Sequence, residues 1–112
     1  MVRNLIFYTF LMFSPLVLAN QQTWSQDSGV ISKFYANNNG SVAISLDGGF
    51  PKASAAIQCS TAPGIWAGDT IVDPIVKSAL LAAYSAGKKV TVTIEGCALG
   101  GGWFRLIDVY LE

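Results

Sequence analysis

The chain has 112 residues, with seven basic and seven acidic side chains and no histidine, so its formal net charge is zero. A chain of this length forms one domain at most. It lacks the residue that most often serves as a general base or metal ligand, and its two cysteines cannot complete a four-thiolate zinc site. Zero net charge provides no long-range field to hold a polyanion. These counts argue against an enzyme, a metal or cofactor, and a nucleic-acid partner.

Residues 1–19 have the pattern of a secretory signal peptide. Arg3 precedes a strongly apolar run, and Val17 and Ala19 stand three and one positions before the expected cleavage point, where small residues are required. The alternative is an uncleaved membrane anchor, but the run is short for a spanning helix and polar residues follow it directly. We predict cleavage, which leaves a single secreted or periplasmic domain over residues 20–112 and no membrane segment.

Residues 20–28 are polar apart from one tryptophan and are interpreted as a lead-in to the first strand. Beyond them, strand and turn signals alternate around one helix. The predicted elements, in chain order, are strands at 29–36 and 41–46, a short third strand at 55–59, a loop at 60–68, a helix at 74–86, a strand at 89–95, a turn at 96–102 and a last strand at 103–111.

The predicted helix carries signals at both of its ends. Asp73 followed by Pro74 matches an N-cap with proline at the first helical position, and Gly87 stands where a left-handed C-cap is wanted. Val76 and Leu80 are four residues apart, which places them on the same face of a helix. We therefore expect one face of this helix to pack on the sheet.

The order of three strands, one helix and two strands is that of the OB-fold, a five-stranded, partly open Greek-key barrel. The predicted fold class is therefore mainly β with one helix (β-β-β-α-β-β), in an OB-fold-like barrel. An α+β sandwich with the same order of elements is the alternative, because order alone does not determine which strands pair.

Cys59 and Cys97 are the only cysteines of the chain. Export would place them in an oxidising compartment, and no CxxC spacing indicates a redox-active pair. We predict that they form a structural disulfide. In the chain-entropy model, a bridge closing a loop of this length contributes about 4 kcal/mol to the stability of a domain.

Both faces of the last predicted strand carry apolar side chains. If Ile107 and Val109 point into the barrel, then Phe104, Leu106 and Tyr110 remain outside. A strand that is apolar on both faces invites aggregation unless another surface covers it. Phe104, Leu106 and Tyr110 are therefore the candidate subunit interface, and packing beneath a local loop is the alternative.

Four residues just before the first predicted strand have the mixture of side chains found in sugar-binding sites. Trp24 offers an aromatic face, and Ser25, Asp27 and Ser28 offer hydrogen-bonding groups. Sugars present hydroxyls to such polar groups and apolar ring faces to aromatic side chains. These four are the candidate glycan-binding residues, and the alternative is a polar lead-in with Trp24 packed on the barrel.

Four segments of the chain, within about residues 24–95, resemble the B subunits of subtilase-cytotoxin and pertussis-like bacterial toxins. They are Ser28-Gly29-Val30-Ile31, Cys59-Ser60, the loop with Trp66, and Ala83-Tyr84-Ser85-Ala86-Gly87 before the Val90 strand. Those proteins are secreted OB-fold subunits that form rings of five, bind sialylated or related glycans and carry a catalytic A subunit.

The resemblance implies a homopentamer, a separate A subunit and a sugar contact by Ser28, which holds the place of the family's sugar-binding serine. The aromatic contact that the family provides on its fourth strand falls near Ile94 in this chain, and the last third of the chain departs from the family pattern.

The predicted function is that of an exported, non-catalytic and ring-forming protein that binds a sialylated or galactosylated cell-surface glycan. The alternative is a stand-alone exported or periplasmic OB-fold module that binds a protein or peptide. An enzyme is the weakest of the three classes, because no spacing among the acidic residues selects a catalytic pair. No cofactor is expected.

Overall fold

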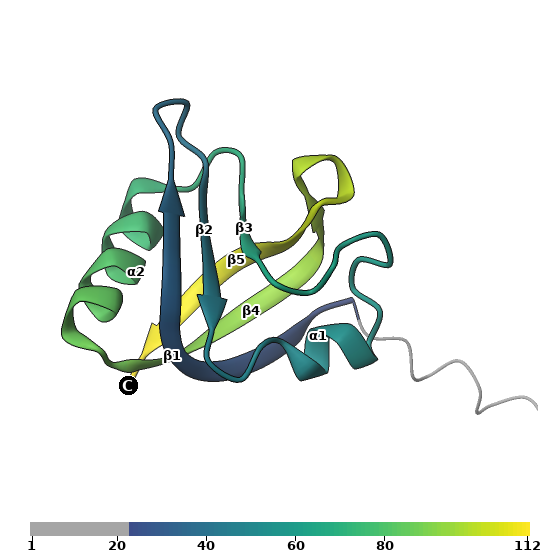
Figure 1. Cartoon of the computed structure of the whole chain (residues 1–112), viewed down its shortest axis with the longest axis horizontal. Coiled ribbons are helices and arrows are strands. Elements are labelled where there is room, and N and C mark those ends of the chain that lie inside the picture. The colour runs from purple at the N-terminus through teal and green to yellow at the C-terminus, as the bar shows by residue number, and fades with distance from the viewer. Residues whose placement is uncertain (1–22) are drawn as a thin grey trace, which may run out of the picture.

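The computed structural model describes residues 23–112, so the predicted signal peptide lies outside the described residues. The elements are β1 (Ser25–Ala36), β2 (Val42–Leu46), α1 (Pro51–Ala55), β3 (Ala67–Asp69), α2 (Pro74–Ala86), β4 (Lys89–Ala98), η3 (Leu99–Gly101) and β5 (Trp103–Leu111). The strands form one mainly antiparallel sheet (Figure 1). Within residues 23–112, no helix is long and apolar enough to cross a membrane.

The five strands pair in the order β1-β2-β3-β5-β4, and β4 returns to β1, so the sheet closes on itself. β1 makes this possible because its first half pairs with β4 and its second half with β2. The register shifts between Ile31 and Lys33, which places a bulge at Ser32. Bulges bend a strand, and β1 turns sharply along its length in Figure 1.

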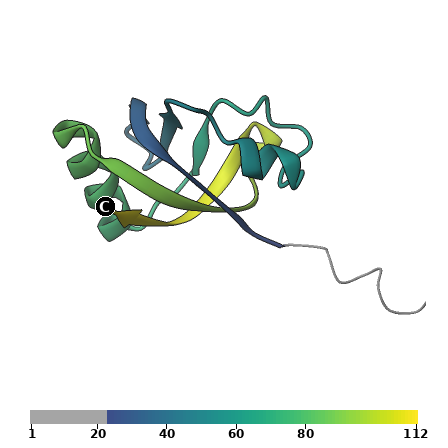
Figure 2. The same ribbon diagram turned by 90° about the horizontal axis from the view of Figure 1, so that it is seen from below.

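The core lies inside this closed sheet, and α2 packs against β1 and β5 at one end of it (Figures 1 and 2). Phe34 on β1 stacks against Tyr84 on α2, with ring centroids 5.8 Å apart. The most deeply buried large side chains come from β2, β4, β5 and α2, and they are Val42, Ile44, Leu80, Val90, Val92, Ile94 and Phe104. The chain ends beside α2, at the close of β5.

The helix predicted over 74–86 is confirmed, together with both of its caps. The Asp73 side chain accepts a hydrogen bond from the Ile75 backbone N–H at 2.9 Å, and Pro74 occupies the first turn. Gly87 is left-handed, with φ of 65°, and its N–H reaches the last carbonyls of the helix. Local sequence alone determines these contacts, which is why the pattern of residue types was sufficient to predict them.

The third strand predicted over 55–59 is wrong. Residues 51–55 form α1, and the third strand is the three-residue β3. The Asp27 carboxylate accepts hydrogen bonds from the backbone N–H groups of Lys52 and Ala53, at 2.9 and 3.0 Å, and so satisfies the start of α1. β3 contains none of the usual strand formers, and it is extended because β2 pairs on one side of it and β5 on the other.

The prediction that Phe104 and Leu106 lie outside the barrel is also wrong. Phe104 is 2% exposed and Leu106 is 5% exposed, and both belong to the main core. Thr93 pairs with Asp108 whereas Ile94 pairs with Leu106, so Ile107 is an extra residue on β5. Because of this bulge, the residues of β5 before Ile107 face the opposite way from what uninterrupted alternation predicts. Two of the three candidate interface residues are therefore buried.

The predicted disulfide is confirmed between Cys59 and Cys97. It ties the loop that follows α1 to β4, beside a hydrogen bond of 2.8 Å from the Thr61 hydroxyl to the Gly101 carbonyl. This loop lies over β2, where Ser45 Oγ donates to the Ile65 carbonyl at 2.7 Å. All five residues of β2 are consequently buried, on both faces of the strand.

Candidate functional site

Two rows of polar side chains cross the outer face of β1, β4 and β5. In the first row, Gln26 on β1 stands opposite Thr93 on β4, and Thr93 stands opposite Asp108 on β5. Directly opposite residues of antiparallel strands share a face, so these three side chains lie side by side. Gln26 Nε2 donates to Thr93 Oγ1 at 3.0 Å, which leaves the Gln26 carbonyl oxygen as an open acceptor.

In the second row, Ser28 on β1 stands opposite Thr91 on β4, and Thr91 stands opposite Tyr110 on β5. Ser28 Oγ lies 2.7 Å from Thr91 Oγ1, which donates to Glu112 Oε2 at 2.7 Å. A hydroxyl has a single proton to donate, so Ser28 must be the donor to Thr91. The exposed Ser28 oxygen is therefore left as an acceptor.

Two open hollows lie along these rows. One has a volume of about 350 Å³ and the other of about 250 Å³, and they share Gln26 and Tyr110 in their walls. The larger is completed by Thr91 and Glu112, and the smaller by Trp24, Thr93, Ile107 and Asp108. Neighbouring strands are about 4.8 Å apart and successive same-face residues about 7 Å apart, so the two rows cover the area of one or two sugar rings.

Two exposed aromatic side chains stand in the wall of the smaller hollow, beside polar residues that are more deeply buried. Trp24 is 48% exposed and Tyr110 is 54% exposed, whereas Thr93 is buried. One carboxylate oxygen of Asp108, Oδ1, is buried and has no hydrogen-bond partner among residues 23–112. Buried carboxylate oxygens are normally hydrogen-bonded, so this atom marks a polar position that the described part of the chain does not satisfy.

The structure separates the four candidate glycan-binding residues into two pairs. Trp24 and Ser28 are on the outer face, with Trp24 in the wall of the smaller hollow and Ser28 in the second row. Ser25 and Asp27 are buried, and Asp27 is held by the backbone of α1. β1 begins at Ser25, before the predicted strand, so alternate residues of this segment point to opposite faces.

Sequence reasoning missed Gln26, Thr91, Thr93 and Asp108. The alternation of Val90, Val92 and Ile94 with Thr91 and Thr93 along β4 is a sequence signal that places both threonines on the outer face. Finding the site also required knowing that β4 lies between β1 and β5, which only the pairing of the strands provides. Ile94 is fully buried, so the position near the family's aromatic sugar contact cannot touch a ligand here.

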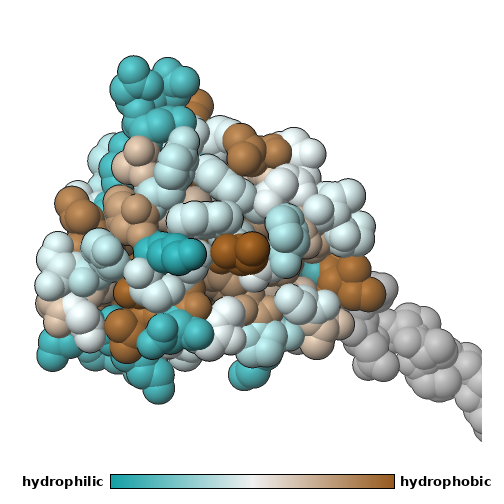
Figure 3. Space-filling view, in the orientation of Figure 1, coloured by the Kyte–Doolittle hydropathy of each residue, from teal (hydrophilic) through white to brown (hydrophobic). Residues whose placement is uncertain are grey.

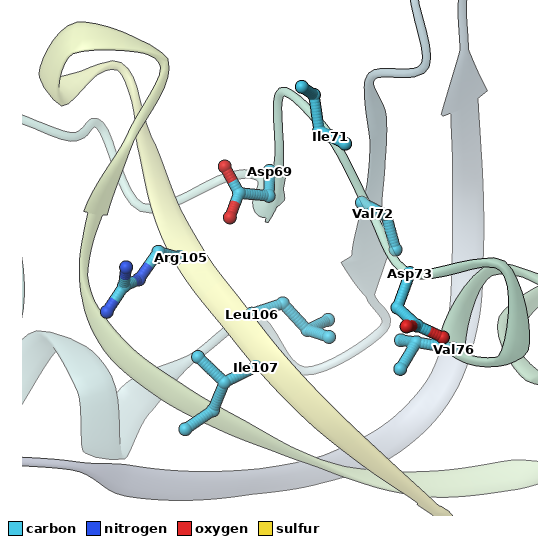
Figure 4. A pocket seen from close by; sticks show the side chains of 8 residues that line it. All are labelled: Asp69, Ile71, Val72, Asp73, Val76, Arg105, Leu106 and Ile107. Atoms are coloured by element: carbon cyan, nitrogen blue, oxygen red, sulfur yellow. The ribbon is translucent and has the colours of Figure 1, made fainter.

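A third hollow, of about 240 Å³, lies where β5 diverges from β3. β3 and β5 pair only through Ala67 with Phe104 and Gly68 with Arg105. Figure 4 shows β5 from Arg105 to Ile107 on one wall and the segment from Asp69 to Val76 on the other. Two of its charged groups already have partners, since Asp73 caps α2 and Arg105 pairs with Glu95 at 3.2 Å.

The remaining aromatic cluster has a structural role. Tyr35 meets Trp66 and Trp103 edge to face, with ring centroids 6.2 and 5.8 Å apart. Trp66 and Trp103 pack with Ala43 and Ala98 in a second small core. Trp66 is therefore a packing residue. The outer surface of β2 is therefore filled by the chain itself.

No protein-family model matches the chain, and neither a curated protein nor a solved structure matches it. The assignment of a function therefore depends on the geometry of the outer face of β1, β4 and β5.

Proposed function

We propose that the chain is an exported, non-catalytic glycan-binding protein with an OB-fold-like barrel, which holds its ligand on the outer face of β1, β4 and β5. The observation that carries the proposal is the smaller hollow, in whose wall the exposed rings of Trp24 and Tyr110 stand together with Gln26 and Asp108. The closed strand order, with α2 packed against β1 and β5, supports the OB-fold part of the proposal.

The side chains of this face match the two chemical surfaces of a sugar. The exposed rings of Trp24 and Tyr110 provide apolar area for the C–H face of a pyranose. Ser28, Gln26 and Asp108 provide oxygens at the spacing of a sheet, to which the ring hydroxyls can donate. Strands hold these groups in place before a ligand arrives, which lowers the entropic cost of binding.

Glycan-array binding by the mature protein tests this proposal. We expect Trp24→Ala to weaken binding about tenfold and Ser28→Ala about threefold, in line with the loss of one stacked ring and of one hydrogen bond. Ser85→Ala, on the exposed surface of α2, is the matched control and should bind like the parent. A folded protein that binds no glycan on a broad array would contradict the proposal.

We further propose that copies of the chain associate, as the resemblance to ring-forming B subunits implies, and that a separate A subunit sits on the ring. Exposed apolar side chains around the third hollow support self-association better than the buried Phe104 and Leu106 do. Ile71 is 79% exposed, Ile75 is 75% exposed, and Ile107 lies close by in the wall of the hollow. On the side drawn in Figure 3, apolar residues form separate patches rather than one continuous surface.

Light scattering on the mature protein at micromolar concentration measures this association. The expected mass is that of five chains, and Ile71→Asp combined with Ile75→Asp should shift it to that of one chain, because a charge in an apolar interface is costly. Ile57→Asp, also highly exposed but in the turn after α1, is the control. A parent protein that scatters as a monomer would remove the ring from the proposal and leave the glycan site untouched.

The second candidate function is that of a stand-alone module that binds a protein or peptide. The edge of β5 beyond Arg105 favours it, because among residues 23–112 no strand pairs with β5 there on the side of β3. An extended peptide can add to such an edge. A monomer that binds no glycan would favour this candidate over the first.

A further inference from the structure

The outer face leaves both hydrogen-bond acceptors and donors open, and its charged groups are acceptors only. The Ser28 hydroxyl donates its single proton to Thr91, and the Thr91 hydroxyl donates its single proton to Glu112. The Gln26 amide nitrogen donates one of its two protons to Thr93, so the side chain offers its carbonyl oxygen and its second N–H, and Thr93 keeps its own hydroxyl proton. The carboxylates of Asp108 and Glu112 only accept. A ligand that satisfies these groups must bring donors for the acceptor oxygens and acceptors for the remaining N–H and O–H groups, and sugar hydroxyls do both.

The charge of the hollows distinguishes neutral from anionic ligands. The side chains that line the two hollows include two carboxylates and no basic group, and they are Trp24, Gln26, Thr91, Thr93, Ile107, Asp108, Tyr110 and Glu112. An anionic ligand in the hollows would meet Asp108 and Glu112, and neither hollow has a lysine or arginine in its wall to compensate for the repulsion. Lys89 stands outside both walls, opposite Glu112 at the start of β4.

We infer that this face binds an uncharged, hydroxyl-rich glycan and discriminates against sialylated ones. The inference rests on the proposed function and names the ligand class within it, since the resemblance to toxin B subunits implies a sialylated glycan. Sugar hydroxyls donate to Asp108, Ser28 and the Gln26 carbonyl, while the apolar face of the ring lies on Trp24. A simple cation would use the carboxylates and the aromatic side chains but would leave the hydroxyl rows without donors.

The test measures oligosaccharide pairs that differ only in a terminal sialic acid, lactose and sialyllactose among them, against the mature protein by calorimetry or NMR titration. We expect the neutral member of a pair to bind at least about tenfold more tightly at low salt. Salt screens the repulsion of the sialylated member, so the ratio should fall as salt is raised.

Asp108→Asn replaces a carboxylate by an amide of the same shape. We expect it to weaken binding of the neutral sugar about fivefold and to reduce the discrimination against the sialylated one, because one acceptor and one negative charge are lost. Asp47→Asn is the matched control. Asp47 is exposed in the turn after β2, so this substitution removes the same charge at a position away from the hollows. Circular dichroism confirms that both variants fold.

The outcomes distinguish failure of the inference about neutral sugars from failure of the proposed glycan-binding function. A sialylated sugar that binds as tightly as its neutral partner, or more tightly, would overturn the inference and leave the glycan-binding function standing. If the folded protein binds none of the pairs, both fail. Tetramethylammonium serves as the cation probe, and its binding to the Trp24 face in place of sugars would also overturn both.

Discussion

Replacing Gly68 by alanine is expected to prevent the domain from folding stably, with a loss of about 4 kcal/mol or more. A Cβ at this position would lie 2.6 Å from the Ala43 Cα and 2.8 Å from its Cβ, and it would collide with the Val42 carbonyl oxygen. All three atoms belong to β2, whose backbone β3 approaches directly.

The surrounding pairing leaves no room for the clash to relax. Gly68 is opposite Ala43 on β2 and opposite Arg105 on β5, so moving β3 away from one strand disrupts its pairing with the other. β3 is also the strand through which the sheet closes between β2 and β5. Loss of this contact would therefore open the barrel and loosen β5, which carries Asp108 and Tyr110.

Urea denaturation followed by circular dichroism measures the effect. Gly48→Ala is the control, because a Cβ at Gly48 would meet nothing within 4 Å. Its free energy of unfolding should stay within about 0.5 kcal/mol of the parent value. A Gly68→Ala protein as stable as the Gly48→Ala protein would show that β2 and β3 do not approach as closely as described.

The contrast between α2 and β3 shows which parts of this fold are accessible to sequence reasoning. The boundaries of α2 depend on Asp73, Pro74 and Gly87, whose effects are confined to their own helix turn. β3 is Ala-Gly-Asp, and its extended conformation comes from two strands that are distant in the sequence. Propensity carries no information about such partners, so the third strand was assigned to the wrong segment.

The faces of β5 were mispredicted for a different reason. Alternation is a reliable guide only while the register is constant, and the extra residue at Ile107 shifts it by one position. Phe104 and Leu106 consequently lie in the core, while Asp108 and Tyr110 lie with Trp24 on the outer face. A bulge has no reliable sequence signal when its residue is a good strand former.

Only part of the candidate site could be predicted from the sequence. Trp24 and Ser28 were found because their residue types suit a sugar, but Ser25 and Asp27 were grouped with them because the start of β1 was placed too late. Once Ser25 begins the strand, period-two alternation puts Asp27 inside, where two backbone N–H groups of α1 use its carboxylate. The contribution of Asp108 depends on pairing across β4 and could not be found locally.

Removing the Cys59–Cys97 disulfide is expected to lower the free energy of unfolding by about 4 kcal/mol, because the bridge closes a sequence separation of 38 residues. In a domain of this size such a loss corresponds to a fall in Tm of about 20 °C. Cys59→Ala combined with Cys97→Ser suits the two environments, since Cys59 is buried and Cys97 is exposed. Thermal and urea denaturation of this variant, and of the parent after reduction, should give the same loss.

We expect removal of the disulfide to lower the stability of the domain without changing its affinity for the ligand. The loop that it ties to β4 lies over β2, where Ser45 bonds Ile65, whereas the polar rows are on β1, β4 and β5. The double variant, studied well below its lowered Tm, is therefore expected to bind the same neutral sugar as the parent with unchanged affinity. A variant that stays fully folded but loses binding would mean that the covering loop contributes to the site, and the ligand would then have to be sought near Trp66 and Trp103.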